Sequence, residues 1–186
     1  MVIEPLKPER GGFQRRFGCG QFIREFLMGH GPEGSPKIDP NKGAPQADIK
    51  FEYKEALYRA MARDRAGREI SDLVKAGVDV TAKEAGEIEQ RHYRRIPAKT
   101  TRMRYHSFMS YFNKLKMLGW VEATGETEPS AFQDSYPAAP PRVYYRLTEK
   151  GSAAADREWS NPLVTLYPQF SLEGYFRGKR NEGRRR

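Results

Sequence analysis

A basic stretch runs from Arg91 to Glu122 and reads RHYRRIPAKTTRMRYHSFMSYFNKLKMLGWVE. It holds ten arginine, lysine and histidine side chains, and no acidic residue occurs in it before Glu122. Arginine can form two hydrogen bonds with a guanine edge, and both arginine and lysine neutralise phosphate charge. Solvated faces of ordinary proteins mix both signs of charge, so this pattern favours a polyanion as the binding partner.

The same stretch carries apolar residues at the spacing of an α-helix. Steps of three and four residues predict a helix over residues 101–118, capped by Thr100 or Thr101 and ended at Gly119. The inward line of this helix is expected to consist of Tyr105, Phe108, Phe112, Leu115 and Leu118. One side of the helix would then pack against a core, while the other side meets the polyanion.

The N-terminal part of a DNA-reading helix enters the groove, so Arg102, Arg104 and His106 are expected to reach base edges. Basic and hydroxyl side chains around them suit contacts with phosphates. The complete predicted nucleic-acid-binding set is Arg94, Arg95, Lys99, Thr101, Arg102, Arg104, Tyr105, His106, Ser110 and Lys114. Tyrosines and phenylalanines in the stretch can also stack on unpaired bases, so DNA is favoured and RNA stays an alternative.

Composition places the chain among compact basic proteins. Its 186 residues suffice for one domain with extensions, and its net charge is +9. The single cysteine, Cys19, rules out an intramolecular disulfide and fits a reducing compartment. No apolar run approaches the roughly 18 residues of a membrane span, and no signal peptide is visible, so we expect a cytoplasmic protein, nucleoid-associated if it binds DNA.

Two further helices are predicted before the basic stretch. The first runs from Asp48, its expected N-cap, to about Arg68, and Gly67 is expected to weaken its end. The second starts at Thr81, which forms a capping-box pattern with Glu84, and ends before Pro97. A short helical segment is also expected in residues 21–28, which precede a linker rich in glycine and proline.

After the basic stretch the pattern changes to strands. Residues 120–123 and 142–147 predict an antiparallel ribbon, joined by a long loop. A last short helix begins at Thr148, with Gly151 as a weak point. The predicted fold is mainly α with a small antiparallel β-ribbon, an α+β arrangement.

The order of the elements indicates one central domain between two extensions. We expect an N-terminal arm and linker over residues 1–47 and the domain over residues 48–159. A C-terminal extension over residues 160–186 ends in a basic tail.

The segments YFNKLKMLGWVEATG and VYYRLTEKGSAAADREW resemble the end of a winged helix-turn-helix domain of the PadR or MarR kind. The resemblance covers about residues 48–158. It implies a DNA-binding domain, often dimeric, of a transcriptional regulator, in which the third helix reads DNA and the ribbon is the wing. The wing loop departs from this pattern because it is acidic. Its tip is therefore not expected to contact phosphates, owing to Glu122, Glu126, Glu128 and Asp134.

Other residue types that could do chemistry are scattered. His30, His92 and His106 lack metal-ligand spacing, and no catalytic motif is recognisable. The sequence therefore predicts a binding protein with no cofactor and no metal, not an enzyme. A second hypothesis is a structural subunit of a larger nucleoprotein assembly, in which the domain is a scaffold and basic arms contact RNA or protein. A homodimer or a larger assembly is left open, and no membrane partner is expected.

Overall fold

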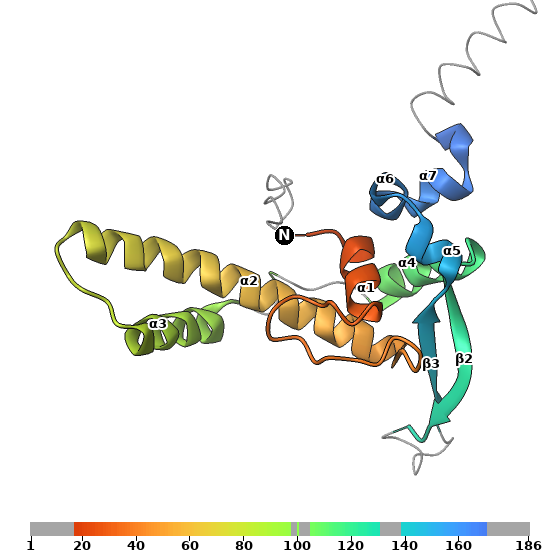
Figure 1. The fold of residues 1–186 in the computed structure, drawn as a ribbon, viewed down its shortest axis with the longest axis horizontal. Coiled ribbons are helices and arrows are strands. Elements are labelled where there is room, and N and C mark those ends of the chain that lie inside the picture. The colour runs from red at the N-terminus through yellow and green to blue at the C-terminus, as the bar shows by residue number, and fades with distance from the viewer. Residues whose placement is uncertain (1–16, 98–99, 101–104, 131–138, 171–186) are drawn as a thin grey trace, which may run out of the picture.

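The computed structural model describes residues 17–97, 100, 105–130 and 139–170 (Figure 1). It confirms a mainly helical α+β fold with a small antiparallel sheet. The helices are α1 (Cys19–Leu27), α2 (Gln46–Lys75), α3 (Ala82–Arg95), α4 (Tyr105–Met117), α5 (Glu149–Ala153), α6 (Asp156–Ser160) and α7 (Pro162–Leu166). The strands are β1 (Ala44–Pro45), β2 (Val121–Glu128) and β3 (Arg142–Leu147), and the 3₁₀ turn η2 (Pro168–Phe170) ends the described chain.

The main hydrophobic core joins α1, the first half of α2, α4 and the start of β2. The apolar side of α1 is buried, with Phe22, Ile23 and Phe26 all at most 2% exposed. Phe17 belongs to the same core and packs edge-on against Tyr53 of α2. The predicted arm over residues 1–47 must therefore be corrected, because part of that segment supplies a core helix.

α2 is longer than predicted and is not broken by glycine. It continues through Gly67, around which a Cβ would meet no atom within 4 Å, and ends only at Lys75. Thirty residues at about 1.5 Å each give a helix about 45 Å long. Pro45, not Asp48, occupies the N-cap position; Asp48 lies in the first turn and forms an ion pair with Arg142 of β3.

α3 packs along the second half of α2 and does not join the main core. Its predicted capping box is confirmed: the Glu84 backbone N–H donates to Thr81 Oγ1 (3.3 Å), and the Thr81 backbone N–H donates to the Glu84 carboxylate (2.8 Å). A separate small cluster joins the two helices and consists of Tyr58, Met61, Ala62 and Ile96, with Tyr93 against it. The second half of α2, the following turn and α3 form a hairpin that projects from the rest of the molecule, at the left of Figure 1.

Within the described residues the sheet has three strands in the order β1-β3-β2, and both pairings are antiparallel. β3 covers the predicted residues, whereas β2 extends to Glu128 rather than stopping at residue 123. β1 lies in the segment predicted as linker; it pairs with β3 through Ala44 opposite Tyr145. Gly43 permits this approach, because it has a φ of 72° and a Cβ there would lie 1.9 Å from the Tyr145 carbonyl oxygen.

The short helices after β3 pack against the core through Gly151 and Trp159. Gly151 is not a weak point: a Cβ there would lie 2.3 Å from the Trp120 carbonyl oxygen, so only glycine allows α5 to approach. The Trp159 indole N–H donates to the Gly151 carbonyl (3.0 Å), and its ring lies 4.8 Å from that of Trp120. Leu166 packs against the core, whereas Leu163 stays 40% exposed.

Candidate nucleic-acid interface

α4 has a buried apolar side and an exposed polar side, as the residue spacing predicts. Phe108, Phe112 and Leu115 are 0% exposed. The exposed residues of α4 are polar, apart from Met117, and comprise His106, Ser107, Ser110, Asn113 and Lys116. Because α4 contains no acidic residue, its exposed side has no carboxylate of its own to repel phosphate.

Aromatic contacts hold α4 in one orientation. Phe112 stacks with Phe108 (5.9 Å between ring centroids) and meets the Tyr145 ring of β3 edge-on (5.1 Å). The Tyr111 hydroxyl donates to the Trp159 carbonyl at 2.9 Å. Such aromatic pairs are worth about 0.5–1.5 kcal/mol beyond burial, so the polar side of α4 is presented by a rigid support.

The end of α4 is connected directly to the ribbon. Gly119 has a φ of 69°, the left-handed conformation expected for it, and the Trp120 backbone N–H donates to the Leu115 carbonyl (3.0 Å). Thr148 closes the junction from the other strand, since its hydroxyl donates to the Gly119 carbonyl at 2.6 Å. The position of α4 and that of the β2–β3 ribbon are therefore linked.

Six of the ten predicted binding residues belong to the described chain. Arg94 and Arg95 lie at the end of α3, and the other four are on α4, with the Tyr105 side chain outside the described part. Lys114 Nζ donates to Ser110 Oγ (2.9 Å) and to the Ser110 backbone carbonyl (3.2 Å). These two hydrogen bonds hold the ammonium group along the helix. Four predicted residues lie outside the described part, namely Lys99, Thr101, Arg102 and Arg104.

The arginines of α3 differ in their partners. Arg91 forms an ion pair with Glu69 of α2, and His92 Nε2 lies 2.7 Å from the second oxygen of the same carboxylate. The hydrogen bonds from Arg91 and His92 lower the pKa of Glu69, and the one from Arg91 has the larger effect. Arg94 and Arg95 are exposed and have no ion-pair partner among the described residues.

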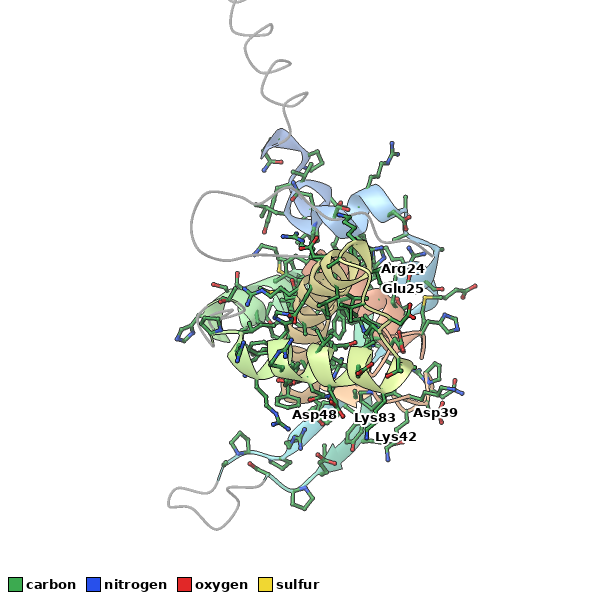
Figure 2. The ribbon with its side chains drawn as sticks, turned by 90° about the vertical axis from the view of Figure 1, so that its left-hand side faces the viewer. Arg24, Glu25, Asp39, Lys42, Asp48 and Lys83 are labelled. Carbon is green, nitrogen blue, oxygen red and sulfur yellow. The ribbon has the colours of Figure 1, made fainter. Side chains whose placement is uncertain are left out.

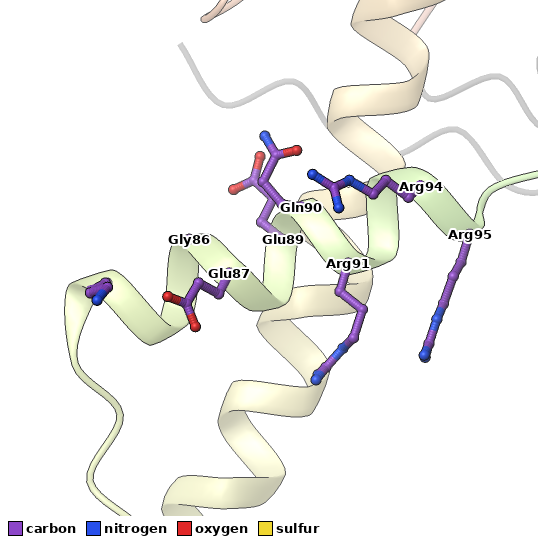
Figure 3. Close-up of a pocket in the computed structure, with 8 residues that line it drawn as sticks. Gly86, Glu87, Glu89, Gln90, Arg91, Arg94 and Arg95 are labelled. Carbon is purple, nitrogen blue, oxygen red and sulfur yellow. The ribbon is translucent and has the colours of Figure 1, made fainter.

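The outer side of α3 is slightly hollowed (Figure 3). The described residues that line this hollow are Lys83, Gly86, Glu87, Glu89, Gln90, Arg91, Arg94 and Arg95. Figure 3 shows Arg91 and Arg95 extending from one side of the helix and Arg94 on the side of Gln90. The basic residues gather in the last turns, where they also complement the helix dipole. The hollow is thus basic at the end that leads towards α4.

The carboxylates of β2 are matched by neighbouring cations. Glu122 accepts from Arg146 of β3 at 2.8 Å, and Glu128 accepts from Arg142 at 2.7 Å. The Tyr144 hydroxyl also donates to Glu128 (2.6 Å), a hydrogen bond that raises the pKa of Tyr144. The register explains both ion pairs, because each glutamate lies directly opposite its arginine on β3.

The remaining described acid of the ribbon, Glu126, lies 3.9 Å from Lys42. Lys42 and Asp48 are labelled near the ribbon in Figure 2. Each described carboxylate of the ribbon thus has a cation within 4 Å, although Arg142 also pairs with Asp48 of α2. Asp134 lies outside the described residues. A count of charges along one strand does not reveal this pairing, because the cations come from a second strand and from the segment before β1.

Within the described residues, no helix is long and apolar enough to cross a membrane, and no group of three or more histidine, cysteine or acidic residues could hold a metal ion. Cys19 is buried. The chain matches no protein-family model, no curated protein and no solved structure. Its function must therefore be inferred from the geometry alone.

Proposed function

We propose that this chain is a winged helix protein that binds double-stranded DNA through α4 and the basic end of α3, and that it regulates transcription in the cytoplasm. The observation that carries the proposal is α4 itself. Its aromatic side is fully buried and its polar side carries no acid. A rigid helix of this kind can enter the major groove, which is wide enough to admit one helix.

The arrangement around α4 supports the winged helix part of the proposal. α1, the first half of α2 and α4 share one core, and a β-ribbon follows α4 directly. β1 adds to the far side of β3, which gives the sheet order β1-β3-β2. In this arrangement the three core helices are α1, the first half of α2, and α4. The second half of α2, the following turn and α3 form an insertion between the second and third of these helices.

The position of each basic residue decides whether it is assigned to base edges or to phosphates. His106 lies on the exposed side of α4 and is assigned to base edges, together with Arg102 and Arg104. The other residues of the predicted set are assigned to phosphates, namely Arg94, Arg95, Lys99, Thr101, Tyr105, Ser110 and Lys114. Because the ribbon carboxylates are paired internally, the described part of the ribbon presents little net negative charge to oppose DNA.

The test measures duplex DNA binding by fluorescence anisotropy at several salt concentrations. In the double variant Arg94→Ala/Arg95→Ala, affinity should fall for every duplex sequence. The slope of log K against log salt should become shallower by about 0.9 for each phosphate that the protein no longer neutralises. A second double variant, Arg102→Ala/Arg104→Ala, should also reduce the discrimination between duplex sequences.

Lys150→Ala/Arg157→Ala is the charge-matched control, because it removes two exposed charges from α5 and α6, helices to which the proposal assigns no DNA contact. Affinity and salt slope should stay close to wild type in this variant. Equal losses in the control and in Arg94→Ala/Arg95→Ala would contradict a defined surface. Tighter binding of an RNA hairpin than of duplex DNA would move the proposal from DNA to RNA.

A structural subunit of a larger nucleoprotein assembly is the second candidate. It is supported by the projecting hairpin, whose second half of α2 lies beyond the main core. Purification from the native cells without nuclease separates the two functions. A defined DNA site favours the regulator, whereas unlike protein chains in fixed ratio with RNA favour the assembly.

A further inference from the structure

The end of the projecting hairpin exposes apolar side chains. We define the hairpin tip as residues 70–84, from the last turns of α2 to the first turn of α3. Val74 is 58% exposed and Val78 is 48% exposed, and Ile70, Leu73 and Val80 are half-buried. Single exposed apolar residues are ordinary, but five within positions 70–80 form a patch of the kind that marks an interaction site.

The hairpin holds this patch in a fixed position. Glu69 of α2 binds Arg91 and His92 of α3, and Arg63 Nε lies 3.2 Å from a carboxylate oxygen of Glu89. The Tyr93 hydroxyl donates to Glu55, one end of the same helix pair. These contacts orient the two helices that carry the tip, so less conformational entropy is lost on binding than for a free loop.

The charge of the tip indicates which partner fits it. The tip contains three acidic residues (Asp72, Asp79 and Glu84) and two lysines (Lys75 and Lys83). Its net charge is therefore −1, whereas the net charge of the whole chain is +9. Polyanions are not attracted to such a surface. Two copies of a strongly basic protein repel each other over most of their surfaces, and the repulsion between two tips of charge −1 is small by comparison.

Lys75 lies 3.7 Å from Asp72 of its own copy, whereas Asp79 and Lys83 are exposed, opposite in charge and without an ion-pair partner among the described residues. In a two-fold contact the same patch is used by both copies, so Lys83 of one copy can face Asp79 of the other. The valines supply an apolar centre, and the charges supply a polar rim.

We propose that two copies of this chain associate through their hairpin tips, with Val74 and Val78 buried at the centre of a two-fold homodimer. The patch is small, so the dissociation constant is expected in the micromolar range, about 1–100 µM. This inference goes beyond the proposed DNA binding: the tips lie at the opposite end of the molecule from α4 in Figure 1, and the dimer would carry two separate α4 surfaces.

The test is sedimentation velocity of the full chain from about 1 µM to about 300 µM, a range that brackets the expected dissociation constant. The wild type should change from monomer to dimer with concentration. Val74→Glu should weaken dimerisation at least about tenfold, since it buries a charge at the contact. Phe51→Glu is the matched control, because Phe51 is 56% exposed on the same helix but lies in its first half. It should dimerise like the wild type.

Cysteine cross-linking gives a second readout, independent of the folding of Val74→Glu. The sole cysteine, Cys19, is buried, so any cross-link forms through the introduced cysteine. Ser71→Cys, which is exposed one helical turn before Val74, should form a covalent dimer on mild oxidation. Lys37→Cys, which is exposed on the loop before β1, should not.

Three results would overturn the inference. These are a wild type that stays monomeric over the whole range, a Val74→Glu dimer as tight as the wild type, and equal cross-linking of the two cysteine variants. DNA binding is measured separately by anisotropy, so a failure of the dimer leaves the α4 proposal standing, and the reverse also holds.

Discussion

Pairing between charged side chains decides which basic residues are available to a partner. Arg91, Arg142 and Arg146 are each held by a carboxylate on a neighbouring element. Arg94 and Arg95 have no such carboxylate among the described residues. A charge count along the chain treats these residues alike, whereas contacts between elements separate structural arginines from those that can bind phosphate.

The Tyr93–Glu55 hydrogen bond makes the hairpin sensitive to alkaline pH. The carboxylate of Glu55, followed by burial, raises the pKa of Tyr93 to about 12. Because the pKa in the folded protein exceeds the usual value near 10, this bond stabilises fully below pH about 10 and is lost as pH rises towards 12. Tyr93→Phe should lower the free energy of unfolding by about 1 kcal/mol at neutral pH and abolish this alkaline loss.

The measurement is urea unfolding of wild type and Tyr93→Phe across this pH window, with tyrosinate absorbance to follow ionisation. Tyr58→Phe serves as the control, because Tyr58 packs on the Tyr93 ring (5.8 Å) without a hydroxyl partner among the described residues. An alkaline loss of stability that persists unchanged in Tyr93→Phe would count against the role of this bond.

Among the elements, α2 is one helix that serves two hydrophobic clusters. Its first half buries Ile49, Tyr53 and Leu57 in the main core, and its second half buries Met61 and Ala62 against α3. A single long helix thus connects the candidate DNA-binding core to the hairpin tip. Gly67 lies in its second half and does not interrupt it.

Two glycines in helices should respond to alanine with opposite signs. Gly151→Ala places a Cβ 2.3 Å from the Trp120 carbonyl oxygen, so it should destabilise the fold by about 1–3 kcal/mol. Gly67→Ala meets no atom within 4 Å and should stabilise α2 by about 0.5–1 kcal/mol. Thermal and urea unfolding of both variants tests the pair, and a neutral Gly151→Ala would argue against close packing of α5 on Trp120.

For the whole molecule, the two clusters differ greatly in size. Among the described residues, eighteen buried side chains form the main core, whereas four form the cluster between α2 and α3. Since buried apolar contacts supply most of the stability, the hairpin should open more readily than the core.

Amide hydrogen exchange of the dilute protein should therefore show two levels of protection. α3 and the part of α2 after Ala66 should exchange faster than α1 and α4, because so few of their side chains are buried. Equal protection of the hairpin and the core below the dimerisation range would contradict this order. Raised protection of the tip at high protein concentration is expected from the proposed dimer.

The local spacing of residues was sufficient for several elements. It predicted the buried side of α4, the capping box at Thr81, the extent of β3 and the left-handed Gly119. These features depend on residues within one or two helical turns, or within one strand, so the pattern that encodes them is visible in the sequence.

Contacts between distant segments were decided only by the tertiary structure. The place of α1 in the core, the addition of β1 to β3, the projection of the α2–α3 hairpin and the pairing of the β2 glutamates each join residues far apart in the chain. The spacing of apolar residues within one element does not indicate which other helix packs against it or which strand pairs with it. The sequence by itself determined which side of α4 is polar and basic. The tertiary structure determined which arginines near it have a carboxylate partner among the described residues, because an ion pair requires two elements to meet in space.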